Sequence, residues 1–266
     1  MNHLMRSHAP ITDIAWSQLD AEGRERLVPA LGARKLVDFS GPLGWGHSAT
    51  NLGRVSDVKA PGENLQARQR KVLPLVELRA PFAISRHELL DADRGAIDLD
   101  LAGLDAAARR IAVAENIAVF HGWPAAGIDG IASSTTHETI TLGTAYPSYP
   151  GHVAKAVETL LEAGVSGPYG LALGPQEYTG VVETTEHGGL VVLDHLRQIL
   201  GGPIVWAPGV EGAVVLSLRG GDFLFESGED LSLGYSHHDA DNAYLYLEES
   251  FSFRITTPEA AVALTA

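Results

Sequence analysis

The chain has 266 residues, of which 45% are apolar, and a formal net charge of −14, so it can bury a sizeable core while its surface repels nucleic acid and anionic membranes. It contains no cysteine, which excludes disulfides, thiolate zinc sites and a cysteine nucleophile and fits a reducing cytoplasm. We find no apolar run of the roughly 18–20 residues that a membrane span requires, and no signal peptide at the start.

The first expected element is a helix that begins after Thr12, a residue that can cap it, and that Pro29 should end or kink. Its apolar residues recur at spacings of three and four, which is typical of an amphipathic helix. This stripe fits ordinary packing on the body of the protein, or one wall of a groove for a partner peptide. It consists of Trp16, Leu19, Gly23 and Leu27.

A short strand is predicted over residues 34–39. Arg34 and Asp38 are four residues apart, so a strand would place both on one face. They could form a surface ion pair, which usually contributes about 0–1 kcal/mol. Alternatively, they could clamp the backbone of a bound peptide.

Residues 47–73 are polar and short of large apolar side chains. Compact domains rarely contain structureless loops of this length, so we predict a two-stranded arm that closes at Pro61-Gly62-Glu63-Asn64. An isolated two-stranded ribbon is marginally stable in water. The arm therefore needs a neighbour to lie on, and another subunit could provide it.

Beyond the arm we expect a strand over Leu73–Phe82 and a short helix that Ser85 and Glu88 open with a capping box. The longest helical pattern follows at Leu101–His121, and its many alanines are typical of a central spine helix. Glu115 lies beside the apolar face of this helix and should pair with a nearby arginine.

Residues 122–131 have the composition of a hinge between lobes, and an α/β pattern follows them. A flexible loop tip at Thr185–Gly189 separates two of its helices. The expected elements are helices at Val153–Ala163, Gln176–Thr184 and Val191–Leu200, and strands at Tyr169–Leu173 and Ile204–Ala207.

Residues 213–255 contain three extended runs, which we interpret as the rigid spine of a subunit that assembles. They are Ala213–Leu218, Asp222–Glu226 and Ala243–Ile255. The last run alternates with a period of two, as a long half-buried strand requires. Glu249 alone interrupts its apolar side, which is formed by Leu245, Leu247, Phe251, Phe253 and Ile255.

Phosphate-binding, dinucleotide-binding, zinc-protease and esterase motifs are absent. One cluster, residues 237–241, could bind a divalent metal through His237, His238, Asp239 and Asp241. These residue types are also common in turns between strands. A metal-dependent enzyme built on this cluster thus stands as one hypothesis, and a simple turn as the other.

Several stretches resemble the encapsulins, the linocin-like bacterial shell proteins. The resemblance covers nearly the whole length and keeps its order along the chain. The stretches are Leu4–Trp16, Gly32–Gly41, Leu75–Arg86, Gly127–Ile131, Gly164–Tyr169, Trp206–Gly212 and Arg219–Tyr235.

This resemblance implies an α+β fold, that of the tailed-phage major capsid proteins. The fold has a discontinuous peripheral domain, an extended arm and an axial domain. In this chain they would comprise residues 1–46, 74–127 and 221–266 for the peripheral domain, 47–73 for the arm, and 128–220 for the axial domain.

The resemblance also implies a function. Encapsulins are not enzymes; they self-assemble into closed icosahedral nanocompartments, here of about sixty copies, around a cargo enzyme. The cargo is commonly a dye-decolourising peroxidase or a ferritin-like iron oxidase, and it docks on the inner wall through a short C-terminal targeting peptide. Because some relatives carry bacteriocin or protease labels, a secreted bacteriocin-like protein is a further alternative.

Positions that match the family's cargo dock are Leu27, Leu31, Arg34, Asp38, Leu231 and Leu233. The family's five-fold pore loop matches Thr185, Glu186, His187, Gly188 and Gly189, where His187 could titrate near neutral pH. One branch of the family holds a flavin against a tryptophan in the helix after the arm. Here His87 occupies that position, so we expect no flavin and no other cofactor.

Overall fold

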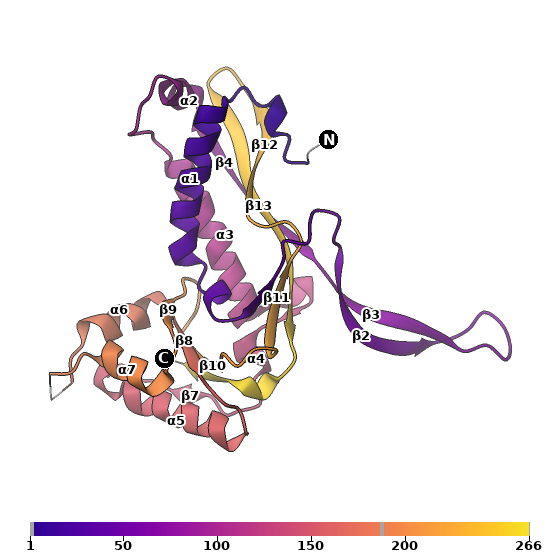
Figure 1. Cartoon of the computed structure of the whole chain (residues 1–266), viewed down its shortest axis with the longest axis vertical. Coiled ribbons are helices and arrows are strands. Elements are labelled where there is room, and N and C mark those ends of the chain that lie inside the picture. The colour runs from indigo at the N-terminus through magenta and orange to yellow at the C-terminus, as the bar shows by residue number, and fades with distance from the viewer. Residues whose placement is uncertain (1–2, 187–188, 266) are drawn as a thin grey trace.

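The computed structural model describes residues 3–186 and 189–265. Two five-stranded sheets organise these residues, one in each half of an elongated body from which a two-stranded arm projects (Figure 1). Apolar side chains form two clusters; one lies within the first half, and the larger surrounds the second sheet and continues into the first through Phe223, Phe225, Phe251 and Phe253. The mixture of helices and strands agrees with the predicted α+β class.

The first sheet is built around β13, which pairs with β4 along one edge and with β12 and then β11 along the other. β1 extends the sheet in parallel beyond β11. The strands are β1 (Asp38–Ser40), β4 (Val76–Ser85), β11 (Phe223–Ser227), β12 (Ser232–His238) and β13 (Asn242–Ile255). The long alternating strand is thereby confirmed.

The expectation that β13 is buried on one side only is wrong. Glu248, Ser250 and Ser252, on its polar side, are all buried. The foot of the arm covers them, since the Thr50 and Ser252 hydroxyls are 2.5 Å apart. Arg79 of the neighbouring strand β4 forms an ion pair with Glu248. Polar partners, not solvent, therefore satisfy the second face of this strand.

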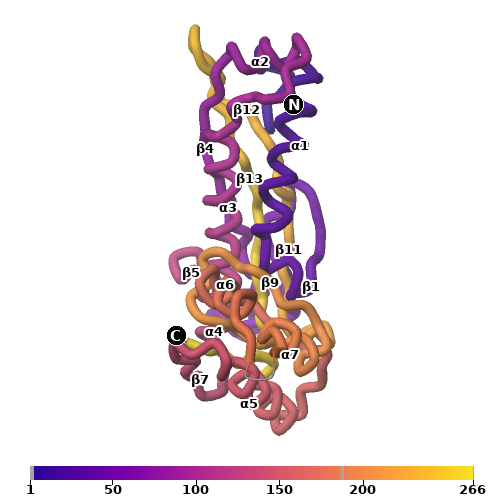
Figure 2. The backbone as a smooth tube through the Cα atoms, turned by 90° about the vertical axis from the view of Figure 1, so that its left-hand side faces the viewer, coloured from indigo at the N-terminus to yellow at the C-terminus, as the bar shows by residue number. Residues whose placement is uncertain are grey.

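Three helices pack on the first sheet, and Figure 2 shows α1 and α3 running along the upper half of the body. Thr12 caps α1 by accepting a hydrogen bond from the Ala15 amide, as expected. The helix ends one residue after Pro29. Ser85 caps α2, but Glu88 accepts from the Asp100 amide instead of completing a capping box. The helices are α1 (Asp13–Ala30), α2 (Arg86–Asp93) and α3 (Ala102–Phe120).

The second sheet has the order β7-β14-β10-β8-β9, and three helices pack around it (Figures 1 and 2). The helices are α5 (Tyr149–Glu162), α6 (Pro175–Glu183) and α7 (Val192–Leu200), close to the predicted ranges. The strands are β7 (Ile140–Thr141), β8 (Tyr169–Leu173), β9 (Ile204–Trp206), β10 (Ala213–Ser217) and β14 (Ala261–Thr265).

The three extended runs do not form a single spine. β10 belongs to the second sheet, whereas β11 and β13 belong to the first. Residues 219–222 therefore connect the two sheets. Within this connection, the Arg219 guanidinium donates two hydrogen bonds of 2.9 Å to the Asp222 carboxylate. The division into peripheral and axial domains stays a prediction. Residues 261–265, which we assigned to the peripheral domain, form β14 and pair with β10 of the predicted axial domain.

Short elements join the two halves where we expected a hinge. The chain leaves α3 through a small hairpin and reaches the second sheet through a one-turn helix. These elements are β5 (Gly122–Trp123), β6 (Ile128–Asp129) and α4 (Ile131–Ser134), with 3-10 turns at Arg6–His8, Ala33–Lys35, Pro124–Ala126, Tyr146–Ser148 and Pro258–Ala260.

The predicted strand over residues 34–39 is wrong at its start. Residues Ala33–Lys35 form a 3-10 turn, and the strand begins only at Asp38. The buried amide of Asn116 on α3 causes this, because its Oδ1 accepts from the Ala33 amide at 3.0 Å and its Nδ2 donates to the carbonyl of Ala30 at 2.9 Å. Arg34 and Asp38 therefore do not share a strand face.

The arm is the two-stranded ribbon that the sequence predicts, formed by β2 (Ala49–Val58) and β3 (Ala67–Pro74). Its turn contains Asn64 with φ 57°. A bulge interrupts the pairing between Asn51 and Arg54, where Gly53 has φ +65° and donates its amide to the Asn51 side chain. The bulge bends the ribbon near its foot.

The arm should be dispensable for folding. Arg54 pairs with Lys71, so deleting residues 55–68 leaves a two-residue connection between paired strands. Residues 51–72 contribute nothing to either hydrophobic cluster. We expect the free energy of unfolding, measured by denaturant titration, to change by no more than about 0.5 kcal/mol.

Truncation of a core residue is the matched comparison for this deletion. Leu104→Ala, on the buried face of α3, should cost about 2–5 kcal/mol. A loss of that size in the arm deletion would mean that the arm contributes to the core.

Candidate functional site

A groove of about 410 Å³ lies between α1 and the start of β12. Its floor is apolar and combines residues from the end of α1 with residues of β12 and β13. Leu27, Leu31 and Leu233 are almost fully buried, whereas Leu231 is half-buried and presents more of its surface. The lining comprises Leu4, Arg6, Asp20, Gly23, Arg24, Leu27, Val28, Leu31, Arg34, Asp230, Leu231, Ser232, Leu233 and Leu247.

The groove brings together five of the six residues predicted for the cargo dock: Leu27, Leu31, Arg34, Leu231 and Leu233. The apolar stripe of α1 places Leu27 at its last turn, and the Leu31 amide still donates to the Leu27 carbonyl at 3.0 Å. Pro29 is exposed and does not line the groove.

Arg34 lines the groove, and each of its three nitrogens is bound to a carboxylate of the chain itself. Nε donates to Glu115 at 2.7 Å, Nη1 to Asp230 at 2.6 Å and Nη2 to Glu249 at 2.8 Å. The pairing of Glu115 with an arginine is thereby confirmed. Glu249, which interrupts the apolar side of β13, is the second buried partner of the same guanidinium.

The electrostatics of this cluster follow from its burial. Burial alone would lower the pKa of Arg34, but the Glu115 and Glu249 carboxyls raise it, so the guanidinium stays charged. Burial also raises the pKa of Glu115. The pKa of Glu249 is raised well above its usual range, first by burial and then by the Glu115 carboxyl beside it.

The remaining charges of the groove lie along α1. Arg6 binds Asp20 through two hydrogen bonds of 3.1 and 2.8 Å and lies 4.1 Å over the Trp16 ring. Arg24 is exposed and makes no hydrogen bond or ion pair with any residue that the structure describes. It is thus the groove cation that is most open to a ligand.

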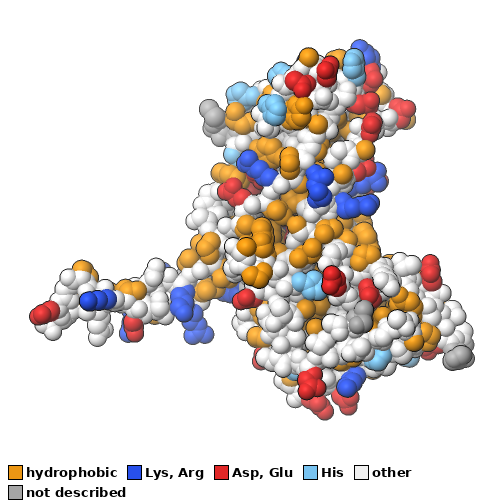
Figure 3. All heavy atoms as spheres, turned by 180° about the vertical axis from the view of Figure 1, so that it is seen from behind, with side chains coloured by type: hydrophobic (Ala, Val, Ile, Leu, Met, Phe, Trp, Pro, Cys, Tyr) orange, Lys and Arg blue, Asp and Glu red, His pale blue; other side chains and the backbone are white. Residues whose placement is uncertain are grey.

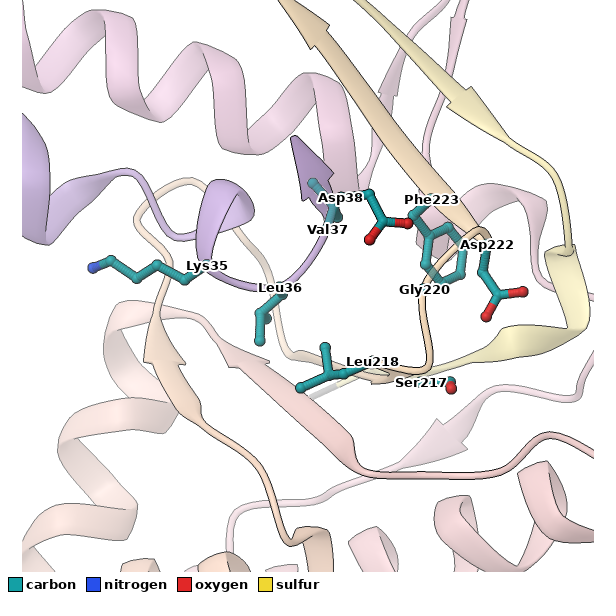
Figure 4. Close-up of a pocket in the computed structure, with 9 residues that line it drawn as sticks. All are labelled: Lys35, Leu36, Val37, Asp38, Ser217, Leu218, Gly220, Asp222 and Phe223. Carbon is teal, nitrogen blue, oxygen red and sulfur yellow. The ribbon is translucent and has the colours of Figure 1, made fainter. Parts of the chain in front are cut away.

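Asp38, the sixth predicted dock residue, lies elsewhere. It lines a separate cavity of about 190 Å³ where the two sheets meet, and its carboxylate points toward Phe223 (Figure 4). Its Oδ2 accepts from the Gly221 amide at 2.6 Å. Asp38 therefore stabilises the loop that connects the two sheets. It lines a different cavity from Arg34, and a clamp by both residues stays a prediction.

The predicted pore loop projects between α6 and α7. Thr185 pairs with Val191 across its base, and the Glu186 amide donates to the Leu190 carbonyl at 2.8 Å. The Glu186 carboxylate lies 2.8 Å from Nδ1 of His195 on α7. Gly189 has φ +81°. His187 and Gly188 lie outside the described residues.

In the cluster at residues 237–241, His237 and His238 end β12, and residues 239–241 form the turn to β13. The Asp239 carboxylate accepts from the amides of Asp241 at 2.9 Å and Asn242 at 2.7 Å, and these bonds lower its pKa. His237 stacks on Tyr244, with ring centroids 4.3 Å apart. Among residues 3–186 and 189–265, no three His, Cys, Asp or Glu side chains are grouped to hold a metal ion.

Two further observations concern the described part of the chain. His87 is exposed on the first turn of α2. None of the helices is both long and apolar enough to cross a membrane.

Residues 1–252 match the family described as "Encapsulating protein for peroxidase". A type 1 encapsulin shell protein of Rhodospirillum rubrum is 47% identical over 99% of this chain and 96% of its own length. That of Mycobacterium tuberculosis is 40% identical over 100% of both chains. This chain belongs to the encapsulin family. The resemblance drawn from the sequence is confirmed, and the named relatives are structural shell proteins, so this encapsulin is not an enzyme.

Solved structures agree on the fold. The virus-like particle protein from Pyrococcus furiosus superposes with a TM-score of 0.60 at 18% identity, covering 94% of this chain and 97% of its own. The capsid protein of an empty GTA particle gives 0.56 at 14% identity, covering 89% and 90%. The capsid-protein fold of the encapsulin is thereby confirmed.

Sequence reasoning missed four charged residues of the groove: Arg6, Asp20, Arg24 and Asp230. Asp20 and Arg24 are spaced at i and i+4 and flank the apolar stripe of α1, so helical periodicity could have placed both beside Leu27. Asp230 precedes Leu231 directly. No local pattern indicates that it approaches Arg34 from a distance of 196 residues along the chain.

Arg34→Ala should destabilise the encapsulin subunit. The substitution leaves the carboxyls of Glu115 and Glu249 buried without their cation, which typically costs about 3–5 kcal/mol. We expect a loss of this size in the free energy of unfolding at neutral pH. Arg24→Ala is the matched control, because Arg24 lines the same groove but is exposed, and it should change stability by less than about 0.5 kcal/mol. Equal effects of the two substitutions would contradict a structural role for Arg34.

Proposed function

We propose that this encapsulin self-assembles into a closed icosahedral shell of about sixty copies in the bacterial cytoplasm, and that the shell encloses a cargo enzyme. The relationship to type 1 encapsulin shell proteins over the whole length of the chain supports this proposal most strongly. The partner in assembly is a second copy of the same chain. Neither nucleic acid nor a membrane is needed, in keeping with the net charge of −14.

The arm supports assembly on physical grounds. Val55, Leu65 and Val72 are 51%, 62% and 46% exposed on a ribbon that would be marginal alone. The arm also carries five cations against two carboxylates in an otherwise acidic chain. Seen from behind, its Lys and Arg side chains follow the ribbon, whereas Asp and Glu side chains lie at both ends of the body (Figure 3). We propose that the ribbon lies on the acidic surface of a neighbouring copy, which would cover its apolar side chains and offset its charge.

We further propose that the groove beside α1 binds the C-terminal targeting peptide of the cargo. The family's description favours a peroxidase as cargo, and a ferritin-like iron oxidase is the other candidate. Apolar side chains of the peptide would cover Leu27, Leu31, Leu231 and Leu233, at about 25 cal/mol per Å² buried. Because the nitrogens of Arg34 are already bound to carboxylates, we assign the register of the peptide to Arg24 and to Asp230, which is 43% exposed.

We place the loop Thr185–Gly189 around the five-fold pore of this shell. A ring of Glu186 carboxylates would favour cations and small substrates over anions, and His195 would hold each carboxylate in place. We propose no flavin or other cofactor, because His87 would offer an exposed imidazole where a flavin-binding relative has tryptophan.

The first test is the size of the purified particle. We expect a megadalton assembly by size-exclusion chromatography and electron microscopy. The variant that lacks residues 55–68 should instead yield folded subunits that do not form closed shells. A wild-type protein that stays at its chain mass of 28.2 kDa at high concentration would overturn the proposal.

The second test concerns the groove. Leu231→Asp places a charge on the half-buried part of the apolar floor, so we expect shells of normal size from which cargo is lost, as measured by mass spectrometry of what co-purifies. Leu231→Met is the matched control, since it keeps an apolar side chain of similar volume and should retain cargo. Full cargo loading of Leu231→Asp would mean that the peptide docks elsewhere.

A further inference from the structure

The carboxyls of Glu115 and Glu249 are the most deeply buried pair of like charges around the groove. Their side chains are 0% and 1% exposed. The Oε2 atom of each accepts from Arg34. The Oε1 atom of each is buried and has no hydrogen-bond partner. The Oε2 atoms of the two carboxyl groups lie 2.7 and 2.8 Å from the same guanidinium nitrogen, Nη2 of Arg34, so the two groups are side by side.

The charges around this pair do not balance if every group is ionised. Arg34 follows α1, Glu115 lies on α3, Glu249 on β13, and Asp230 in the loop between β11 and β12. These four are the titratable groups that face one another. The other neighbours of the guanidinium are aromatic rings, of Phe39 at 5.2 Å and Phe225 at 5.1 Å. One cation would thus face three carboxylates, two of them buried in contact, which is strongly unfavourable.

A single proton removes both the excess negative charge and the lack of hydrogen-bond partners. Shared between the two carboxyls, it provides a hydrogen bond from a carboxylic acid to a carboxylate, which is a short and strong type. It also leaves one buried negative charge beside the one buried positive charge. Arg34 keeps all three of its hydrogen bonds in this state.

We propose that Glu115 and Glu249 share one proton at neutral pH, and that this proton allows the two carboxyls to pack together beside Arg34 in the groove wall, so that alkaline solution opens the groove. The part that concerns the groove rests on the proposed binding of cargo there; the proton itself does not. When the proton leaves, two buried carboxylates repel each other across α3 and β13. Relief requires α3 and β13 to separate or water to enter, and either change displaces the part of the groove wall that Arg34 and Asp230 form.

The direction of the pH effect follows from the raised pKa of Glu249. The folded chain holds a proton that the unfolded chain has already released above the ordinary carboxyl pKa of about 4.3. The stability that the proton provides is therefore complete below that pH and is lost as the pH rises through the raised value. Above it, binding that requires the proton weakens about tenfold for each pH unit.

Infrared difference spectroscopy tests the proton directly. In shells that contain carbon-13-labelled glutamate, the wild type should show the carbonyl band of a protonated glutamic acid at neutral pH, and the band should be lost as the pH rises. Glu249→Gln should lack this band. The glutamine amide then donates the hydrogen bond to Glu115, so that Glu115 is ionised and no carboxylic acid is present. Glu115→Gln provides a second variant should the first fail to fold. Glu226→Gln, on β11 outside the cluster, is the matched control and should keep the band.

Cargo retention tests the consequence. The wild type should release cargo as the pH is raised, whereas Glu249→Gln, whose amide cannot lose the proton, should retain it. No protonated band in the wild type, or a band that persists in both cluster variants, overturns the shared proton. Equal release from the wild type and Glu249→Gln overturns its control of the groove. If no cargo binds at any pH, the proposed function of the groove fails while the infrared result still stands.

Discussion

The structure depends on a buried guanidinium that is held by carboxylates from three different parts of the chain. Arg34 follows the N-terminal helix, Glu115 lies in the middle of the spine helix, and Glu249 lies on the longest strand. A charge can be removed from water only where partners replace its hydration. The position of Arg34 is therefore fixed by elements that lie more than 80 residues apart in sequence. This arrangement helps to determine the shape of the groove, because the same arginine lines it.

Neutral hydrogen bonds support the same junction. The Asn116 side chain, one residue after Glu115, accepts from the Ala33 amide and donates to the carbonyls of Ala30 and Pro208. These bonds stabilise the 3-10 turn at Ala33–Lys35, which directs the Arg34 side chain toward the buried carboxylates. The end of α1, the 3-10 turn and the loop that contains Pro208 are thus all held by Glu115 and Asn116 of α3. The apolar stripe of α1 could pack against α3 in several registers, and the polar contacts select one of them.

Much of this fold is predictable from the sequence, because period-two alternation and apolar stripes encode which face of an element is buried. β13, α1, α3 and the arm follow from such local patterns. β14 was missed although it is apolar, since a short buried strand lacks a distinctive period. The assignment of residues 34–39 failed because a distant amide, that of Asn116, decides the local backbone. Periodicity indicated Leu27 of the groove, whereas Leu31, Leu231 and Leu233 came from the resemblance to the encapsulins. The contacts of Arg34 with Glu249 and Asp230 are tertiary contacts that spacing does not encode.

The bulge between Asn51 and Arg54 has a geometric consequence. It fixes the angle at which the ribbon leaves the body, and hence the inclination of any copy on which the ribbon rests. In the proposed shell, neighbouring copies would all be inclined by the same angle, and the sum of these rotations would determine the radius of the closed shell. A glycine at position 53, free to adopt a left-handed backbone, thereby influences curvature on a scale far larger than the subunit.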